Sequence, residues 1–310
     1  MTWFWSLIDG DEPGEIMATF RICVGLTLAW TFFNGLTTEA WLGLHTGLSH
    51  GGLAPDGTQL WWLEAAGGKT PGNVWWLTVT GVASSLALAL GVGWRVTPLV
   101  TIWVSLALFG LHPGSGGGHD RLLTNALWVL VLADSTATWS LDARLWRGGR
   151  WSSGARIPSW PRRLAIYQLV LMYTITGLEK QGSAWGPSTG YAAVYRTLLL
   201  PTWVRFDFTW LAHVYPLTQI GTFVAWWWEL TWFVLGLNLV ARTAGAPRWL
   251  GWLGRIDLRP IYVGIGVILH GSLWVTMALG PFSPATFAYY VCLISPREAE
   301  RGLSRWRATS

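Results

Sequence analysis

Eight apolar runs constrain the fold of this chain more than any other feature of its sequence. A transmembrane helix needs about 20 apolar residues to cross roughly 30 Å of hydrocarbon, and most of the runs reach or approach that length. They cover residues 16–36, 74–93, 96–112, 121–138, 163–181, 219–241 and 261–281, and a shorter eighth run covers 284–295. The runs predict an all-α, polytopic membrane protein with about eight transmembrane helices.

Composition supports the same class of protein. Of the 310 residues, 52% are hydrophobic and 12% are charged, against about 25% charged in soluble proteins. The 26 tryptophans suit the lipid bilayer as a partner, because indole favours the headgroup interface. The pI near 9.5 comes from arginines in loops between apolar runs, so nucleic acid is not an expected partner. We expect one membrane domain over residues 1–310, with a short basic tail at 296–310.

The arginines predict the orientation of the chain in the membrane. They concentrate in the segments 139–163 and 242–259 and in the tail, and the positive-inside rule places such segments on the cytoplasmic side. Both termini are then cytoplasmic, and the connections 37–73, 113–120 and 182–218 face outward. The chain is rich in arginine, alanine, glycine and tryptophan and poor in lysine, and this composition suggests a bacterium. We therefore expect the bacterial cytoplasmic (inner) membrane.

Lysine is rare in this chain. Lys69 and Lys180 are the only two among 21 basic residues, and 21 − 2 leaves 19 arginines. Arginine stays protonated, whereas a lysine that is shielded from water can lose its proton and act as a base. Lys180 ends the fifth apolar run at the predicted outer boundary. It could extend to the membrane interface as a long side chain, or it could be catalytic.

Three more polar residues lie where the membrane should be. His119 precedes the fourth run at the same predicted level as Lys180, and with Asp120 it should open a helix. His270 lies in the middle of the seventh run, where it could pack against a neighbouring helix or line a polar cavity. Glu229, in the middle of the sixth run, should take a proton or find a donor.

Other sequence features carry weaker signals. His270 and Arg21 are candidate donors to Glu229, although Arg21 lies near the predicted cytoplasmic boundary and could simply extend to the interface. The segment HTGLSH has no acidic companions, so no metal site is expected. The sequence contains no phosphate-binding loop, serine elbow or metalloprotease motif.

Four segments together carry a resemblance to a known family. They are HDRLLTNALWVLVLADSTATWSLDA, YTITGLEKQGSAW, WWWELTWFVLGL and LHGSLWVTMALGPFSPATFAYYVCL. In order and spacing they resemble the membrane portion of the vitamin K-dependent gamma-carboxylase and its bacterial relatives, called the horizontally transferred transmembrane (HTTM) domain. The resemblance covers about residues 15–300. Each segment alone is a weak signal, whereas four in register are specific.

The resemblance implies roles for individual residues. Tyr173, Gly177 and Lys180 match a segment whose lysine is the base that deprotonates a hydroquinone. His119 matches a histidine that assists this chemistry, and His270 matches one that precedes a phenylalanine-serine pair. The implied catalytic residues are thus Lys180, His119 and His270, and the implied cofactor-binding residues are Tyr173, Glu229 and Trp185. Trp139–Asp142 matches a family landmark that we expect to be structural.

The implied function is that of a quinol-dependent oxygenase or carboxylase on the extracytoplasmic side. Its reductant would be a reduced quinone, menaquinone or vitamin K hydroquinone, with O2 and CO2 as co-substrates and no metal. Burial among apolar groups can leave a lysine amine uncharged and able to take the hydroxyl proton. The animal enzyme continues into a large soluble domain, whereas this chain has a short tail at the corresponding place. A peptide substrate or a soluble partner protein is therefore expected only in addition to the quinone.

Two alternatives remain from the sequence. The chain could be a non-catalytic membrane accessory protein for export or maturation of a peptide, or a protein that binds a quinone or lipid. A transporter is less favoured, because no internal repeat is evident.

Overall fold

The computed structural model describes residues 10–146, 154–243 and 245–309, and these residues are mostly helical. Their contacts define two compact units. Of the described residues, the N-terminal unit comprises those of Asp11–Ala165 and those from Pro284 on, and the middle unit comprises those of Ile166–Ser283. The prediction of one membrane domain over residues 1–310 stays a prediction. The arginines between 147 and 153, used above for orientation, lie outside the described residues, as do residue 310 of the tail and residues 1–9.

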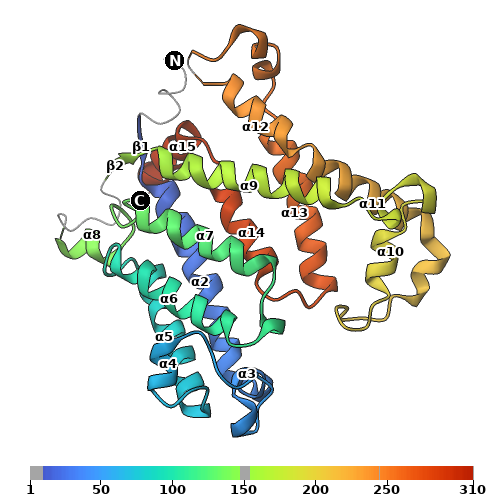
Figure 1. Ribbon diagram of the computed structural model, residues 1–310. Coiled ribbons are helices and arrows are strands. Elements are labelled where there is room, and N and C mark those ends of the chain that lie inside the picture. The colour runs from blue at the N-terminus through green and yellow to red at the C-terminus, as the bar shows by residue number, and fades with distance from the viewer. Residues whose placement is uncertain (1–9, 147–153, 244, 310) are drawn as a thin grey trace. The chain divides into compact units, whose positions relative to one another are not determined.

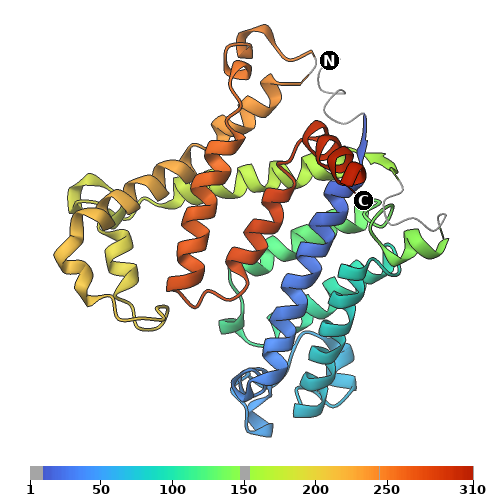
Figure 2. The same ribbon diagram turned by 180° about the vertical axis from the view of Figure 1, so that it is seen from behind.

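Four helices build most of the N-terminal unit (Figure 1). They are α2 (Glu15–Thr37), α5 (Pro71–Leu90), α6 (Val96–Gly110) and α7 (Gly118–Leu132). Figure 2 shows α2 running beside α5, and α6 packs in turn against α5. Residues spaced four apart share one face of a helix, and α2 buries such a face completely with Phe20, Val24, Leu28 and Phe32.

Glycine lets α2 and α5 approach closely. A Cβ atom on Gly25 would lie 2.6 Å from the backbone nitrogen of Ala89, and one on Gly81 would lie 2.8 Å from the ring of Phe32. Small residues at such contacts are typical of helix pairs in membranes, because they bring the two backbones together.

Short elements connect the long helices of this unit. They are β1 (Asp11–Pro13), α3 (Glu39–His45), a 3-10 turn (Leu48–His50), α4 (Trp61–Ala65), a 3-10 turn (Pro113–Ser115), α8 (Leu141–Trp146), β2 (Arg156–Pro158), the end of α14 (Phe282–Val291) and α15 (Pro296–Thr309). Strands β1 and β2 pair antiparallel, with Glu12 opposite Ile157.

A buried ion pair holds three distant segments of this unit together. The Arg162 Nε atom donates to both carboxylate oxygens of Glu12, at 2.7 and 2.9 Å, and Arg162 Nη1 donates to the carbonyl of Cys292 at 2.8 Å. Both charged residues are buried. Arg162 therefore contributes to the fold as well as to the basic segment 139–163.

The Arg21 side chain does not extend to the interface as the sequence suggested. It is completely buried, and its guanidinium donates to the carbonyls of Ser135 and, at 2.5 Å, Trp139. Trp139 has a positive φ of 47°, and Asp142 three residues later accepts from the backbone of Gly93 and Trp94. The Trp139–Asp142 turn thus makes the structural contacts expected of it.

The middle unit is built from helices around the C-terminal part of α9 (Trp160–Glu179). They are α10 (Ala193–Leu198), α11 (Tyr215–Leu230), α12 (Trp232–Ala241) and α13 (Arg259–Thr276), with 3-10 turns at Ser183–Trp185, Pro187–Thr189, Thr209–Val214, Arg248–Leu250 and Leu253–Arg255. The segment Thr209–Leu230 and helix α12 meet at an angle of 41°. The Tyr262 hydroxyl donates to the carbonyl of Thr231 in this break at 2.9 Å, which compensates a backbone group that the bend frees.

Each predicted apolar run coincides with helix, although several boundaries were wrong. The fourth run was predicted to reach residue 138, but α7 ends at Leu132. The seventh was predicted to reach 281, but α13 ends at Thr276, and Gly280 with φ of 58° follows. The sixth is split between α11 and α12.

Two helices in the described part of the chain are long and apolar enough to cross a membrane. They are Glu15–Thr37 and Pro71–Leu90, and the bent pair Thr209–Leu230 with Trp232–Ala241 would be a third if it forms one span. Helix α6 is apolar but shorter. The helical fold and these segments agree with a membrane-associated protein, and the number of eight spans stays a prediction.

Candidate functional site

The middle unit brings Lys180 against α11 through a close crossing of two helices. Lys180 follows the last residue of α9, one turn after Gly177. A Cβ atom on Gly177 would lie 2.5 Å from the backbone nitrogen of Leu230, so α9 and α11 meet at this glycine. The crossing places the end of α9 beside Glu229, which is the residue before Leu230.

Lys180 and Glu229 form an ion pair. Their side chains are 20% and 17% exposed, so the pair is largely shielded from water. The Lys180 ammonium also lies 4.8 Å from the centre of the Trp185 ring, within the range of a cation–π contact. Lys180 is therefore in contact with two other residues that the sequence singled out, Glu229 and Trp185.

The surroundings of Lys180 differ from those predicted. The sequence predicted an amine among apolar groups, whereas the structure pairs it with a carboxylate. The suggested partners of Glu229 were Arg21 and His270. Its observed partner is Lys180, and Arg21 instead binds carbonyls within the N-terminal unit. Glu229 gives the amine an immediate acceptor for its proton.

A second cluster, the Tyr173–His270 cluster, is buried on the same two helices and on α13. The Tyr173 hydroxyl and His270 Nε2 are 2.7 Å apart, and the two residues are 2% and 3% exposed. Trp232 stacks on the Tyr173 ring with centres 4.5 Å apart, and Trp228 meets the same ring edge-on at 4.7 Å. The Phe282 ring lies 5.3 Å from that of His270. His270 is therefore a hydrogen-bonded residue of an aromatic core.

The two clusters are continuous along the chain. Tyr173 and Lys180 are two helical turns apart at the end of α9, and Trp228 and Glu229 are consecutive residues on α11. A change in the Tyr173–His270 cluster would thus shift the helices that hold the ion pair. This continuity is the structural reason to treat the five residues Tyr173, Lys180, Trp185, Glu229 and His270 as one candidate site.

His119 belongs to the N-terminal unit, in the first turn of α7. Its Nε2 lies 2.9 Å from the carboxylate of Asp120, and that carboxylate accepts from the backbone nitrogen of Gly117 at 2.6 Å. The prediction that His119 and Asp120 open a helix is confirmed. The prediction that His119 acts together with Lys180 joins the two units and stays a prediction.

The sequence reasoning assigned no role to Lys69, the second lysine. The side chain is buried in the N-terminal unit, at the wall of a cavity. The scarcity of lysine that drew attention to Lys180 was an equal signal for Lys69.

Comparison with known proteins adds no relative. No family model, no curated protein and no solved structure matches the chain. The resemblance to the HTTM membrane domain therefore rests on its four sequence segments.

Proposed function

We propose that the protein is a quinol-dependent oxygenase or carboxylase of the bacterial cytoplasmic membrane, with Lys180 as the base that deprotonates a hydroquinone substrate. The observation that carries the proposal is the ion pair between Lys180 and Glu229 beside Trp185. Apart from Lys69 and Lys180, the positive charges of this chain come from arginines, which keep their protons. Lys180, which is paired with a carboxylate, can instead exchange a proton.

The pair can perform the proton transfer in two steps. The Lys180 ammonium first gives a proton to the Glu229 carboxylate, which leaves a neutral amine and a neutral acid. The amine then takes the hydroxyl proton of the hydroquinone. Reaction of the deprotonated substrate with O2 would supply the oxidising chemistry and a strong base for carboxylation.

Aromatic and apolar side chains around the pair suit a lipid-soluble ring. Trp185 lies against Lys180, and α9 and α11 carry exposed large apolar side chains at Ile175, Leu178 and Trp227, within one or two turns of Lys180 and Glu229 in the sequence. Tyr173 and His270 hold α9 and α13 together through their hydrogen bond. We assign them a positioning role in this scheme, and the resemblance assigns His119 an assisting role.

The proposed membrane arrangement has eight spans, with both termini cytoplasmic and Lys180 at the outer boundary. The coincidence of the eight apolar runs with helix supports it, and so does the concentration of arginines in the connections assigned to the cytoplasm. In this arrangement the pair is reached from the outer leaflet, where a reduced menaquinone can diffuse.

The function is tested by incubating the purified protein in lipid nanodiscs with reduced menaquinone, O2 and labelled bicarbonate. We expect oxygen-dependent formation of quinone epoxide, and transfer of label to an added glutamate peptide if carboxylation is retained. A folded protein that forms no epoxide under any condition would instead favour the non-catalytic accessory protein.

A further inference from the structure

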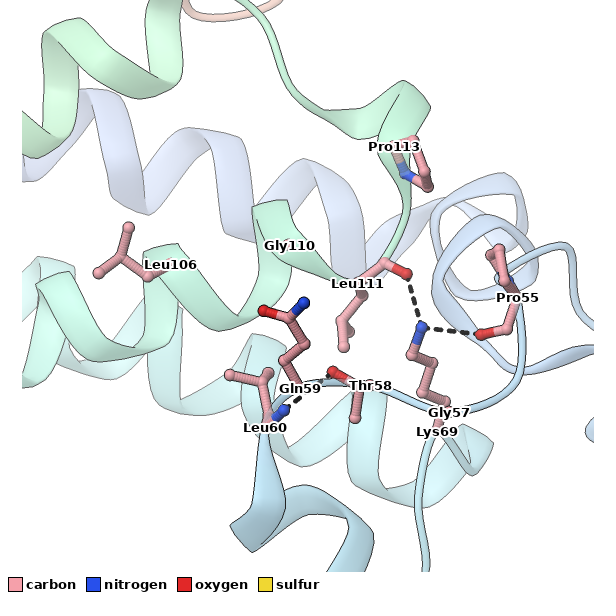
Figure 3. Close-up of a pocket in the computed structure, with 10 residues that line it drawn as sticks. All are labelled: Pro55, Gly57, Thr58, Gln59, Leu60, Lys69, Leu106, Gly110, Leu111 and Pro113. Atoms are coloured by element: carbon pink, nitrogen blue, oxygen red, sulfur yellow. Dashed lines mark hydrogen bonds between the residues drawn. The ribbon is translucent and has the colours of Figure 1, made fainter.

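A cavity of about 360 Å³, at the wall of which Lys69 is found, lies in the N-terminal unit. Its walls come from the connections around α4 and from the C-terminal end of α6 (Figure 3). Leu60, Leu106 and Leu111 form an apolar side, and Thr58 and Gln59 contribute polar groups. This volume is within the range of roughly 300–1,000 Å³ that small-molecule sites occupy.

Lys69 provides a buried positive charge at this cavity. The residue is 7% exposed, and its amine donates to the carbonyls of Pro55 at 2.9 Å and Leu111 at 2.8 Å, as Figure 3 shows. An ammonium has three N–H donors, so the two carbonyls leave one for a ligand. Among the described residues, no carboxylate lies within ion-pair distance of Lys69.

The electrostatics of this position call for an anion. Burial lowers the pKa of Lys69, and the more distant carboxylates of Glu64 and Asp56 act in the opposite direction. Two carbonyl dipoles hold the ammonium but do not neutralise it, and neither of these carboxylates is in contact with it. A buried charge without a counter-ion in contact is costly. A bound anion would supply the missing charge.

The lining selects among anions. One ammonium matches the single charge of a carboxylate, whereas a phosphate monoester carries about −1.5 to −2 charges, and no arginine is among the described residues that line the cavity. The leucine side of the cavity suits an apolar chain attached to the charged group.

We propose that this cavity binds a small amphipathic carboxylate, with the acid group on Lys69 and an aliphatic chain along Leu60, Leu106 and Leu111. Gln59 and Thr58 offer further hydrogen bonds to the acid group. The proposal does not depend on the quinol chemistry assigned to Lys180, and it assigns the second lysine of the chain a ligand-binding role.

The test uses the scarcity of lysine as a spectroscopic advantage. Protein labelled with [13Cε]lysine carries only two labelled side chains, Lys69 and Lys180. Their resonances are assigned in nanodiscs with Lys69→Arg and Lys180→Arg. We titrate with hexanoate and, as a control of equal chain length, with hexanol. Hexanoate should shift the Lys69 resonance in a saturable manner and leave that of Lys180 unchanged, and hexanol should shift neither.

Two variants separate binding from folding. Lys69→Met should weaken hexanoate binding about tenfold or more, because a charged hydrogen bond contributes about 1.5–3 kcal/mol. Gly110→Phe adds a ring at a residue that lines the cavity and leaves the lysine in place, and since a Cβ at Gly110 meets no atom within 4 Å the fold should tolerate it. Gly43→Phe is the matched control, because Gly43 is equally open and does not line the cavity.

The proposal requires that Gly110→Phe abolish the hexanoate-induced shift and that Gly43→Phe preserve it. An unchanged Lys69 resonance at saturating hexanoate, an equal response to hexanol, or full binding by Gly110→Phe would each overturn it. In that case Lys69 serves only to join two loops through their carbonyls.

Discussion

The two lysines of this chain lie in contrasting surroundings. Lys69 donates to two backbone carbonyls and lies at a cavity, whereas Lys180 is paired with the carboxylate of Glu229 and lies over an indole ring. A carbonyl oxygen can hold an ammonium but does not take its proton at ordinary pH, while a carboxylate can. The difference separates a lysine suited to bind a charge from one suited to exchange a proton.

Removal of the proton acceptor beside Lys180 should have the largest effect. Glu229→Gln keeps the shape of the side chain but cannot receive the ammonium proton, so epoxide formation should fall by about 10²-fold or more, the usual contribution of a general acid or base. Glu179→Gln is the matched control, because Glu179 is the exposed neighbour of Lys180. Equal rates for the two variants would show that Glu229 takes no part in proton transfer.

Loss of Lys69 should affect stability and leave epoxide formation unchanged. Lys69→Met leaves the carbonyls of Pro55 and Leu111 without their donor, which should lower the free energy of unfolding by about 2 kcal/mol. The measurement is the midpoint of denaturant unfolding in mixed micelles. A stable variant that has lost epoxide formation would contradict the separation of the two lysines.

The crossing at Gly177 should determine whether Lys180 meets Glu229. Gly177→Ala places a methyl group against the backbone of Leu230, and such overpacking typically destabilises by about 1–3 kcal/mol. We expect lower stability and slower epoxide formation together. Gly182→Ala is the control, since a Cβ there meets no atom within 4 Å. If both variants behave like the unaltered protein, the crossing does not position the site.

The smallest predicted effect is a pH dependence from Lys69. Because burial lowers its pKa below the ordinary value of 10.5, the unfolded chain binds this proton more strongly than the folded protein does. The contribution of Lys69 to stability therefore increases as pH rises from the folded pKa towards 10.5. The [13Cε]lysine resonance that disappears in Lys69→Arg should titrate with a midpoint below 10.5, and a midpoint at or above that value would refute the predicted burial.

The helical segments could be predicted from the sequence, because a run of apolar residues both favours burial and covers a helix on all sides. The helix ends could not be placed as well. The end of α13 at Thr276 and the break at Thr231 lie within continuous apolar sequence, where local tertiary contacts such as the hydrogen bond from Tyr262 compete with intrinsic preference.

The members of the candidate site could be chosen from the sequence, but their partners could not. Lys180 and Glu229 are 49 residues apart, and their contact depends on how two helices cross at Gly177. Arg21 shows the same limit, since its position near a predicted boundary gave no sign that carbonyls from the Trp139 turn would bury it. Lys69 is the other of the two lysines, so the same scarcity applied to it. The cavity beside it is formed by loops, however, and their packing cannot be predicted from an apolar pattern.

The most direct test of the account is the rate of quinone epoxide formation in Lys180→Arg and Lys69→Arg, measured side by side in nanodiscs with reduced menaquinone and O2. Arginine keeps the positive charge and can still pair with Glu229, but it does not release its proton. The account predicts that Lys180→Arg forms no epoxide above background while Lys69→Arg retains the rate of the unaltered protein. Epoxide formation by Lys180→Arg at the unaltered rate would contradict it.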